Sequence, residues 1–326
     1  MIKLFYKDKV ILVTGGTGFV GIHLVQELIK NGAKVRITVN KRPLVIEDKN
    51  IETVKADLTK QDDCIKAVKG ADFVFHAAGL VSGVGVKSNF MISGITANLV
   101  MTAQMLKSAC DENIERFLIF SSSTGYPLTN YPVKEEEMWA GPMPPFYSGY
   151  GWMRRYFEKL SEFIASNSNM KIAIVRPTAV YGRWDNFDIM TSHFIPALVR
   201  KAVEKQNPYE VWGSGEDCRD CLHITDLARG CLLMLEKNAN CDPVNIGYGR
   251  AYKIKEIVRI ILKAAGHENA NVVFNTSKPT AIPFRMVDVS KAKKILGFEP
   301  QTTLEEGLKD TVDWYARTRN LFPNIQ

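Results

Sequence analysis

A tyrosine and an arginine four residues apart carry the most direct chemical signal in this chain. Tyr150 and Arg154 lie in a segment with a helical pattern, so both fall on one face of the predicted helix. A cation beside a phenol stabilises the phenolate, which makes a tyrosine usable as an acid or a base near neutral pH. Because such pairs also occur as ordinary surface packing, a second signal is needed to assign chemistry here.

A cluster of hydroxyl side chains supplies that second signal. Ser121, Ser122, Ser123 and Thr124 follow an apolar run that predicts a strand. In an open α/β sheet, ligands bind beyond the carboxyl ends of the strands. A serine at this position can therefore hydrogen-bond a substrate carbonyl or hydroxyl beside Tyr150, whereas without the tyrosine the run would indicate only a turn.

A glycine-rich turn predicts the cofactor. The run TGGTGFVG at 14–21 directly follows the apolar run 10–13 and directly precedes a helical segment at 21–31. Glycines let the backbone turn tightly and approach a pyrophosphate, and the helix that follows offers unpaired N–H groups and its positive dipole end. A glycine string alone is weak, but this one has both flanks that a dinucleotide site requires.

Alternating apolar runs and amphipathic segments predict the fold that positions these groups. The expected strands are 10–13, 35–39, 52–55, 73–76, 117–121 and 172–176, and the expected helices are about 21–31, 60–69, 96–111 and 150–166. Gly32 and Gly70 stand just past the first two helices, where a left-handed cap residue is typical. The pattern indicates an α/β protein with a doubly wound parallel sheet, a Rossmann domain.

We interpret residues 1–180 as the dinucleotide-binding domain and 181–326 as a smaller α/β substrate-binding lobe, because prolines, aromatic residues and irregular connections increase after about residue 180. We expect 218–248 to return to the first domain, with an added strand and helix between Cys218 and Leu235. The acidic run 135–137 is expected at the start of a loop or helix.

Composition narrows the class of protein. The chain has 326 residues, of which 46% are apolar and 24% charged, as in ordinary globular proteins. The net charge is +7, but the lysines and arginines are scattered among acidic residues, so the sequence does not indicate a nucleic-acid-binding surface. No apolar run is long enough to span a membrane. Six sparse cysteines, including Cys218 and Cys221, form no disulfide or metal framework; we expect no metal and a cytoplasmic location.

Several motifs in order resemble one enzyme family. They are TGGTGFVG, GADFVFHAAG at 70–79, FSSSTGYP at 120–127, YGWMR at 150–154, RPTAVYG at 176–182 and RMVDVSKAKKILGF at 285–298. Together they resemble the extended short-chain dehydrogenases/reductases, the NAD-dependent epimerase/dehydratase family, over essentially the whole chain. DNF at 185–187, SHFIPAL at 192–198 and VWGSGEDCRDCLH at 211–223 are most similar to GDP-fucose synthase and its nucleotide-sugar relatives.

The resemblance implies catalytic roles for five residues. Tyr150 matches the acid/base and Ser122 the serine that orients the carbonyl, with Ser123 as a close rival for that role. Arg154 stands where the family has lysine; it keeps the charge, but its planar fork cannot copy the hydrogen bonds of an ammonium group. His193 occupies the position of a histidine that exchanges protons during epimerisation, either as a substrate partner or as a packed histidine.

Thr124 occupies the position of the cysteine that works with this histidine in the resembled synthase. A hydroxyl is a far weaker acid than a thiol, which titrates at about 8.5. The sequence therefore puts in doubt the full epimerase/reductase reaction of the resembled synthase. The corresponding 4,6-dehydratases carry an acidic pair where this chain has Ser123 and Thr124, so dehydration is disfavoured.

The expected cofactor contacts come from the glycine turn, the ends of the second, third and fourth strands, the catalytic helix and the segment after the sixth strand. They are Thr14, Gly15, Thr17, Gly18, Phe19, Val20, Asn40, Lys41, Arg42, Asp57, Leu58, Ala77, Ala78, Gly79, Tyr150, Arg154, Pro177 and Val180. At 40–42 no acid is present to hold a ribose 2′-hydroxyl, and two cations suit a 2′-phosphate. NADP(H) is therefore favoured, with NAD(H) as the other possibility.

Substrate contacts follow from the same resemblance, which implies a nucleotide-diphosphate sugar. The expected residues are Ser122, Thr124, Asn186, His193, Lys201, Trp212, Arg219 and Arg285. Guanidinium forks suit diphosphate oxygens. The family also implies a homodimer built from the helices near 96–111 and 150–166, whose apolar residues Leu99, Met105, Leu106, Phe157, Leu160 and Phe163 fit an interface as well as a core.

These observations favour an NADP(H)-dependent reductase that acts at C4 of a nucleotide-diphospho-4-keto-sugar, GDP-sugars first, with an accompanying epimerase activity left open. One alternative is a 4-epimerase with permanently bound NAD. Another is a non-catalytic dinucleotide sensor, which the arginine at 154 would suit but which the retained Ser122 and Tyr150 disfavour.

Overall fold

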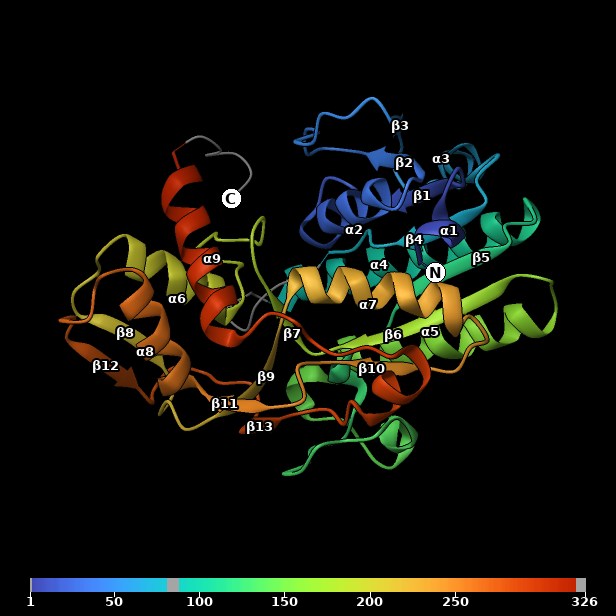
Figure 1. The fold of residues 1–326 in the computed structure, drawn as a ribbon. Helices are drawn as coiled ribbons and strands as arrows, with labels where there is room; N and C mark the ends of the chain where they lie inside the picture. The colour runs from blue at the N-terminus through green and yellow to red at the C-terminus, as the bar shows by residue number, and fades with distance from the viewer. Residues whose placement is uncertain (1, 81–87, 321–326) are drawn as a thin grey trace.

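The computed structural model describes residues 2–80 and 88–320, and it is built around a seven-stranded parallel sheet (Figure 1). The strand order is β10-β6-β5-β4-β1-β2-β3. The strands are β1 (Val10–Thr14), β2 (Lys34–Val39), β3 (Ile51–Lys55), β4 (Phe73–His76), β5 (Arg116–Phe120), β6 (Lys171–Pro177) and β10 (Val244–Ile246). The six strands predicted in the first half are confirmed to within one residue at each end, as is the doubly wound fold.

Helices cover both faces of this sheet. On one face lie α1 (Ile2–Tyr6), α2 (Phe19–Lys30) and α7 (Ile224–Lys237), and on the other α3 (Gln61–Val68), α4 (Ser88–Asp111) and α5 (Ser148–Ser166). Leu24, Leu28 and Leu227 are among the buried residues of the first face, and Met105, Leu106 and Phe157 are among those of the second. Gly32 and Gly70 have φ of +82° and +74°, so the predicted left-handed caps are confirmed.

A second group of elements packs beside the large sheet, around a core of its own (Figure 1). In it, β9 (Cys218–His223) pairs with β7 (Ala179–Tyr181), β11 (Ala251–Lys253) and β13 (Phe284–Arg285), and β8 (Tyr209–Trp212) pairs with β12 (Val272–Asn275). Its helices are α6 (Phe194–Val203), α8 (Ile254–Ala264) and α9 (Leu304–Thr318). All of these elements lie at or beyond β7, and the proposed division of the chain near residue 180 stays a prediction.

One topological expectation is wrong in part. Helix α7 does pack against α2 and β6, but β9, the strand between Cys218 and Leu235, does not join the large sheet. Both of its edges are taken by strands of the second group. The strand that joins the large sheet is β10, which pairs with β6 beyond α7.

Short helices complete the described chain. They are the 3-10 helices η1 (Ser123–Gly125), η2 (Glu135–Trp139) and η3 (Pro145–Tyr147), and the π-helical turn η4 (Ala292–Leu296). The acidic run 135–137 begins η2, as expected, and the Glu137 carboxylate accepts a hydrogen bond from the Lys134 N–H at 2.7 Å. Within the described residues no helix has the length and apolar character needed to cross a membrane.

Candidate active site

The glycine turn forms a tight cradle between β1 and α2. Gly15 has φ of +65°, and its N–H donates to the Thr38 hydroxyl at 3.0 Å. A Cβ added to Gly21 would lie 2.1 Å from the Gly15 carbonyl oxygen, and one added to Gly15 would lie 2.8 Å from the Ala78 Cα. Gly18 is the N-cap of α2 and provides no side-chain cap, so backbone N–H groups at the helix start are left for an anion. The turn therefore fits the pyrophosphate of a dinucleotide.

A buried histidine fastens the floor of this cradle. The Thr14 hydroxyl lies 2.8 Å from His76 Nδ1 and accepts a hydrogen bond from the Ala78 N–H at 3.1 Å. His76 Nε2 lies 3.2 Å from the Thr102 hydroxyl on α4. Burial lowers the pKa of His76 to about 3, so the ring stays neutral. Sequence reasoning missed both His76 and Thr102. The sequence signal for His76 is its position directly before Ala77 and Ala78, which were expected to contact the cofactor.

The ends of β2 and β3 surround the expected adenosine position. Asn40, Lys41 and Arg42 are exposed beyond β2. The Asp57 carboxylate accepts hydrogen bonds from the Thr59 hydroxyl at 2.7 Å and N–H at 3.1 Å, which lower its pKa. Leu58 is 4% exposed and packs in the core, so its backbone rather than its side chain is available to a ligand.

The serines of the hydroxyl cluster alternate between buried and half-buried side chains. Ser121 and Ser123 are 2% and 7% exposed, while Ser122 between them is half-buried. Ser122 has an extended backbone and caps η1, with its Oγ accepting from the Thr124 N–H at 3.2 Å. Of the two rival serines, Ser122 is thus the more accessible to a ligand.

Tyr150 lies near the start of α5 with its hydroxyl buried. Among the described residues this hydroxyl has no hydrogen-bond partner. A Cβ added to Gly94 of α4 would lie 3.1 Å from the phenol oxygen, a tight contact that a small shift of the tyrosine would have to relieve. A buried, unpartnered donor is costly, which favours a partner supplied by a ligand.

Arg154, one turn further along α5, bridges to β5. Its Nη1 donates to the Phe120 carbonyl at 2.6 Å, and its guanidinium lies 5.6 Å from the centre of the Phe157 ring. Burial lowers the pKa of Arg154 to about 10, and the nearby Tyr150 opposes that shift. The arginine therefore remains charged at neutral pH between the two segments that carry Ser122 and Tyr150.

Two arginines lie opposite each other on adjacent strands. Arg219 and Arg285 are paired in register on β9 and β13. Arg285 is 6% exposed; it donates to the Pro127 carbonyl at 3.0 Å, and its Nε has no partner among the described residues. Arg219 donates to the Cys218 and Ile282 carbonyls at 2.9 Å and 2.5 Å. Burial lowers the pKa of Arg285 to about 10, so its guanidinium stays charged at neutral pH.

The loop before α6 holds two of the expected substrate residues. His193 is the N-cap of α6; its side chain is exposed, yet the surrounding protein lowers its pKa through desolvation. The Asn186 side chain is engaged within its own loop, where it donates to the Thr191 hydroxyl at 2.8 Å and accepts from the Asp188 N–H at 3.0 Å. His193 is thus the freer of the two to meet a ligand.

Lys201 and Trp212 lie beside β8. Lys201 Nζ donates to the Glu210 carbonyl at 2.8 Å, and burial lowers its pKa. Trp212 is 40% exposed, with Lys278 Nζ 5.7 Å above its ring. In the described parts of the chain, no hydrogen bond or ring contact joins this pair to Ser122 or Tyr150.

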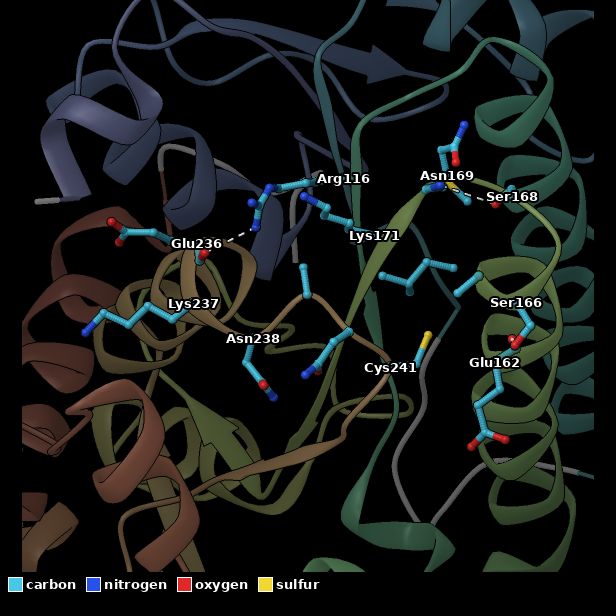
Figure 2. A pocket seen from close by; sticks show the side chains of 15 residues that line it. Arg116, Glu162, Ser166, Ser168, Asn169, Lys171, Glu236, Lys237, Asn238 and Cys241 are labelled. Atoms are coloured by element: carbon cyan, nitrogen blue, oxygen red, sulfur yellow. Dashed lines mark hydrogen bonds between the residues drawn. The ribbon is translucent and has the colours of Figure 1, made fainter.

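A cavity of about 610 Å³ lies elsewhere and is not the candidate site. Figure 2 shows it at the starts of β5 and β6, which are the ends opposite to Ser122, between the last turns of α5 and α7. Arg116 and Lys171 line it with Glu162 and Lys237, and Arg116 donates to the Leu235 and Glu236 carbonyls at 2.8 Å and 3.2 Å.

Comparisons with known proteins show which family the chain belongs to. Residues 11–247 match the model of the NAD dependent epimerase/dehydratase family. The putative GDP-L-fucose synthase 2 of Arabidopsis thaliana is 29% identical over 95% of this chain and 92% of that protein. The GDP-L-fucose synthase of Escherichia coli K12 is 31% identical over 77% of this chain and 82% of its own length.

A solved structure gives the same answer at the level of the fold. The UDP-glucose 4-epimerase of Thermotoga maritima, determined with UDP-glucose, superposes with a TM-score of 0.85 at 25% identity and covers 95% of this chain and 99% of that one. In this chain the glycine turn lies between β1 and α2, Tyr150 lies on α5, and the serines follow β5. The chain belongs to the NAD-dependent epimerase/dehydratase family and is an enzyme of the extended short-chain dehydrogenase/reductase type.

Proposed function

We propose that this enzyme is an NADP(H)-dependent reductase that acts at C4 of a nucleotide-diphospho-4-keto-sugar. The observation that carries the proposal is the buried Tyr150 hydroxyl, which lacks a partner among the described residues. Tyr150 lies on α5, and Arg154 of the same helix donates a hydrogen bond to the backbone at the end of β5. Ser122, just beyond that strand, is accessible. Similarity to GDP-L-fucose synthases over most of the chain supports the substrate class.

Each residue of the candidate site has its own role in the proposed reduction. The glycine turn would hold the dinucleotide, whose reduced nicotinamide would supply the hydride for the carbonyl carbon. The Ser122 hydroxyl donates a hydrogen bond to the carbonyl oxygen, and Tyr150 donates its proton to that oxygen as negative charge develops. Arg154 supplies positive charge beside Tyr150. Arg219 and Arg285 hold the diphosphate, because guanidinium groups bind such oxygens with two parallel bonds.

We infer that NADP(H) is preferred over NAD(H). Asn40, Lys41 and Arg42 are exposed beyond β2 and present cations without an acid. The experiment is a titration followed by nicotinamide fluorescence, with NADPH and NADH compared at equal ionic strength. NADPH is expected to bind more tightly, and tighter binding of NADH would overturn the preference.

We infer further that any epimerisation is weak. Thr124 offers a hydroxyl where a thiol would be needed to protonate a carbanion, and His193 remains as a substrate hydrogen-bond partner. The test is turnover in deuterated water followed by NMR of the product. Reduction without deuterium at the carbons flanking C4 is expected, while stoichiometric incorporation there would show that epimerisation proceeds.

One panel of assays tests the reductase proposal itself. GDP-, CDP-, UDP- and dTDP-4-keto-sugars are offered with each reduced nicotinamide, GDP-sugars being favoured. Oxidation of the nicotinamide with the parent enzyme and its loss in Tyr150→Phe are expected, with dinucleotide binding intact. Full turnover by Tyr150→Phe would remove this residue from the mechanism.

A 4-epimerase is the second candidate, favoured by the structural likeness to an epimerase of this type. Such an enzyme oxidises and re-reduces the same carbon and keeps its NAD. Near-stoichiometric NAD released on denaturation would support it over the reductase. A non-catalytic sensor would be favoured instead if neither the parent nor Arg154→Lys turned over any sugar of the panel.

A further inference from the structure

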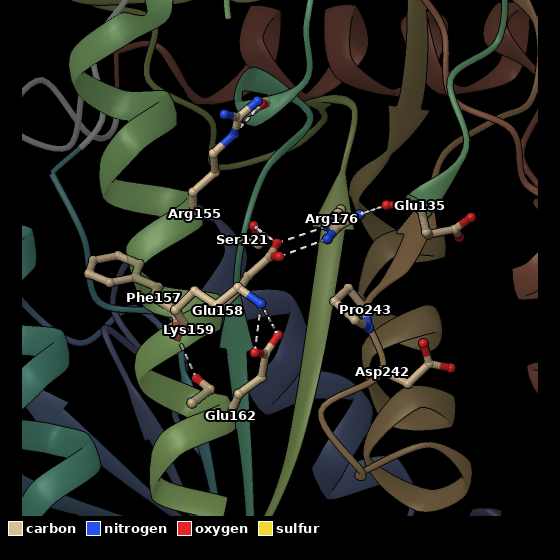
Figure 3. Close-up of polar contacts among 12 residues, drawn as sticks. Ser121, Glu135, Arg155, Phe157, Glu158, Lys159, Glu162, Arg176, Asp242 and Pro243 are labelled. Atoms are coloured by element: carbon tan, nitrogen blue, oxygen red, sulfur yellow. Dashed lines mark hydrogen bonds and ion pairs between the residues drawn. The ribbon is translucent and has the colours of Figure 1, made fainter. Parts of the chain in front are cut away.

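A buried ion pair lies directly behind the hydroxyl cluster. Glu158 of α5 and Arg176 of β6 are 1% and 2% exposed. Arg176 Nε donates to Glu158 Oε1 at 2.8 Å and Nη2 donates to Oε2 at 2.7 Å, as Figure 3 shows. A buried pair of this kind adds little net stability, because desolvation offsets the attraction, so its value is sought in the geometry it imposes.

The same carboxylate holds the end of β5. The Ser121 hydroxyl donates to Glu158 Oε1, and Ser121 immediately precedes Ser122 (Figure 3). Successive side chains of an extended segment point to opposite sides. With Ser121 held inward by Glu158, Ser122 is directed outward, in agreement with its half-buried state beside two buried serines.

Helical spacing places Glu158 in line with the candidate catalytic groups. Tyr150, Arg154 and Glu158 follow each other at intervals of four, so they share one face of α5. Arg154 bonds the Phe120 carbonyl and Glu158 bonds the Ser121 hydroxyl. Two consecutive residues at the end of β5 are thus held by the helix that carries Tyr150.

Arg176 extends the network toward the substrate side. Its Nη1 donates to the Tyr126 hydroxyl at 2.9 Å and to the Glu135 carbonyl at 2.7 Å. The Tyr126 hydroxyl donates to Asn245 Oδ1 at 2.6 Å, and the Tyr126 carbonyl accepts from Arg285 Nη2 at 3.4 Å. Burial lowers the pKa of Arg176, but the hydrogen bonds and charges of Glu158 and Tyr126 together raise it more, so the guanidinium stays charged.

We propose that Glu158, charge-paired with Arg176, is a positioning residue that fixes the Ser122 hydroxyl relative to the Tyr150 phenol. The inference rests on the proposed reductase function for its kinetic consequences, but the geometry it describes exists without substrate. One carboxylate joins α5, the end of β5 and β6 at a single buried point. Loosening any of the three bonds changes the separation on which proton transfer to the substrate oxygen depends.

The test uses variants that loosen the network and matched controls on the same helix. Ser121→Ala removes one bond and leaves the ion pair, and Glu158→Gln weakens the pair. Ser161→Ala removes a buried hydroxyl of α5 whose one hydrogen bond among the described residues goes to the Phe157 carbonyl. Glu162→Gln removes a surface carboxylate that pairs with Lys159. Thermal unfolding establishes that each variant is folded.

For Ser121→Ala we expect kcat with the accepted sugar to fall about 10-fold, while KM and the NADPH dissociation constant change less than about twofold. The Tyr150 13Cζ resonance, assigned by its loss in Tyr150→Phe, is expected to shift in Ser121→Ala and Glu158→Gln without substrate. Neither change is expected in Ser161→Ala or Glu162→Gln.

Each result separates the two proposals. If Tyr150→Phe is inactive while Ser121→Ala and Glu158→Gln match their controls in kcat and in the NMR signal, Glu158 has no positioning role and the reductase stands. If Tyr150→Phe is fully active, the proposed function fails, and the NMR comparison still decides whether Glu158 sets the geometry of Tyr150. Should Glu158→Gln unfold, Ser121→Ala alone decides.

Discussion

Arg154 joins the two segments that carry the candidate catalytic hydroxyls, so its replacement tests charge and connection together. Its guanidinium bonds the Phe120 carbonyl, and burial lowers its pKa to about 10. We predict that Arg154→Met lowers kcat about 100-fold, within the range for general acid–base groups, because positive charge beside Tyr150 is lost. Since a desolvated charge is removed, the melting temperature is expected not to fall. Turnover equal to that of the parent would contradict this role.

A second residue predicts how stability depends on pH. Asp185 is 6% exposed, and burial raises its pKa to about 8, opposed by one hydrogen bond from the Asn186 N–H. Its ordinary pKa is 3.8, so between about pH 4 and 8 the folded state holds a proton that the unfolded state has released. The contribution is full below this window and is lost as pH rises to about 8.

We therefore predict that Asp185→Asn reduces the pH dependence of unfolding by one proton. The variant should match the parent near pH 4 and exceed it at pH 8 by roughly 4–5 kcal/mol, because one proton contributes about 1.4 kcal/mol per pH unit across this window. Urea denaturation at four pH values measures the slope. Asp313→Asn, at a surface carboxylate paired with Lys309, is the control and should leave the slope unchanged.

At the scale of elements, the junction of β1 and α2 depends on a glycine that no other residue can replace. A Cβ at Gly21 would lie 2.1 Å from the Gly15 carbonyl oxygen. Gly21→Ala is predicted to lower the unfolding free energy by about 1–3 kcal/mol, as overpacking does. It should also weaken NADPH binding at least about 10-fold, because α2 is pushed away from the turn.

Gly70 provides the control for this prediction. It has φ of +74° and nothing within 4 Å of an added Cβ. Gly70→Ala is expected to cost about 1 kcal/mol from the left-handed backbone alone and to leave NADPH affinity unchanged. Fluorescence titration and urea denaturation measure both quantities, and equal loss of affinity in the two variants would argue against the cradle.

The sequence predicts the bounds of those elements whose apolar residues repeat at a regular spacing. The strands β1 to β6 of the large sheet and helix α5 carry regular apolar periods, and the sequence predicts their ends within one or two residues. The sheet that β9 joins was not foreseen correctly, because pairing with β7, β11 and β13 is set by residues distant in the chain. Thr38, His76 and Arg176 were missed for the same reason, since their partners lie 18 to 62 residues away.

At the scale of the whole molecule, the outer faces of α4 and α5 are unusually apolar. Among the six apolar residues that fit an interface as well as a core, Met105, Leu106 and Phe157 are at most 1% exposed and belong to the core. Trp152, Tyr156 and Phe163 instead stand 58%, 52% and 67% exposed, at spacings of four and seven along α5. Val100 and Ile92 are exposed on the neighbouring α4.

We propose that this α4–α5 face joins two copies of the chain, since large apolar side chains gathered on adjacent helices usually mark an interaction site. The parent is predicted to sediment as a dimer of 36.6 kDa chains. Trp152→Glu combined with Phe163→Glu should sediment as a monomer, because each substitution meets its symmetry mate or the apolar face around it. Met190→Glu, at a side chain 66% exposed in the loop before α6, is the matched control and should remain dimeric. A monomeric parent at micromolar concentration would refute the interface, whereas a dimeric double variant would place the contact on another face.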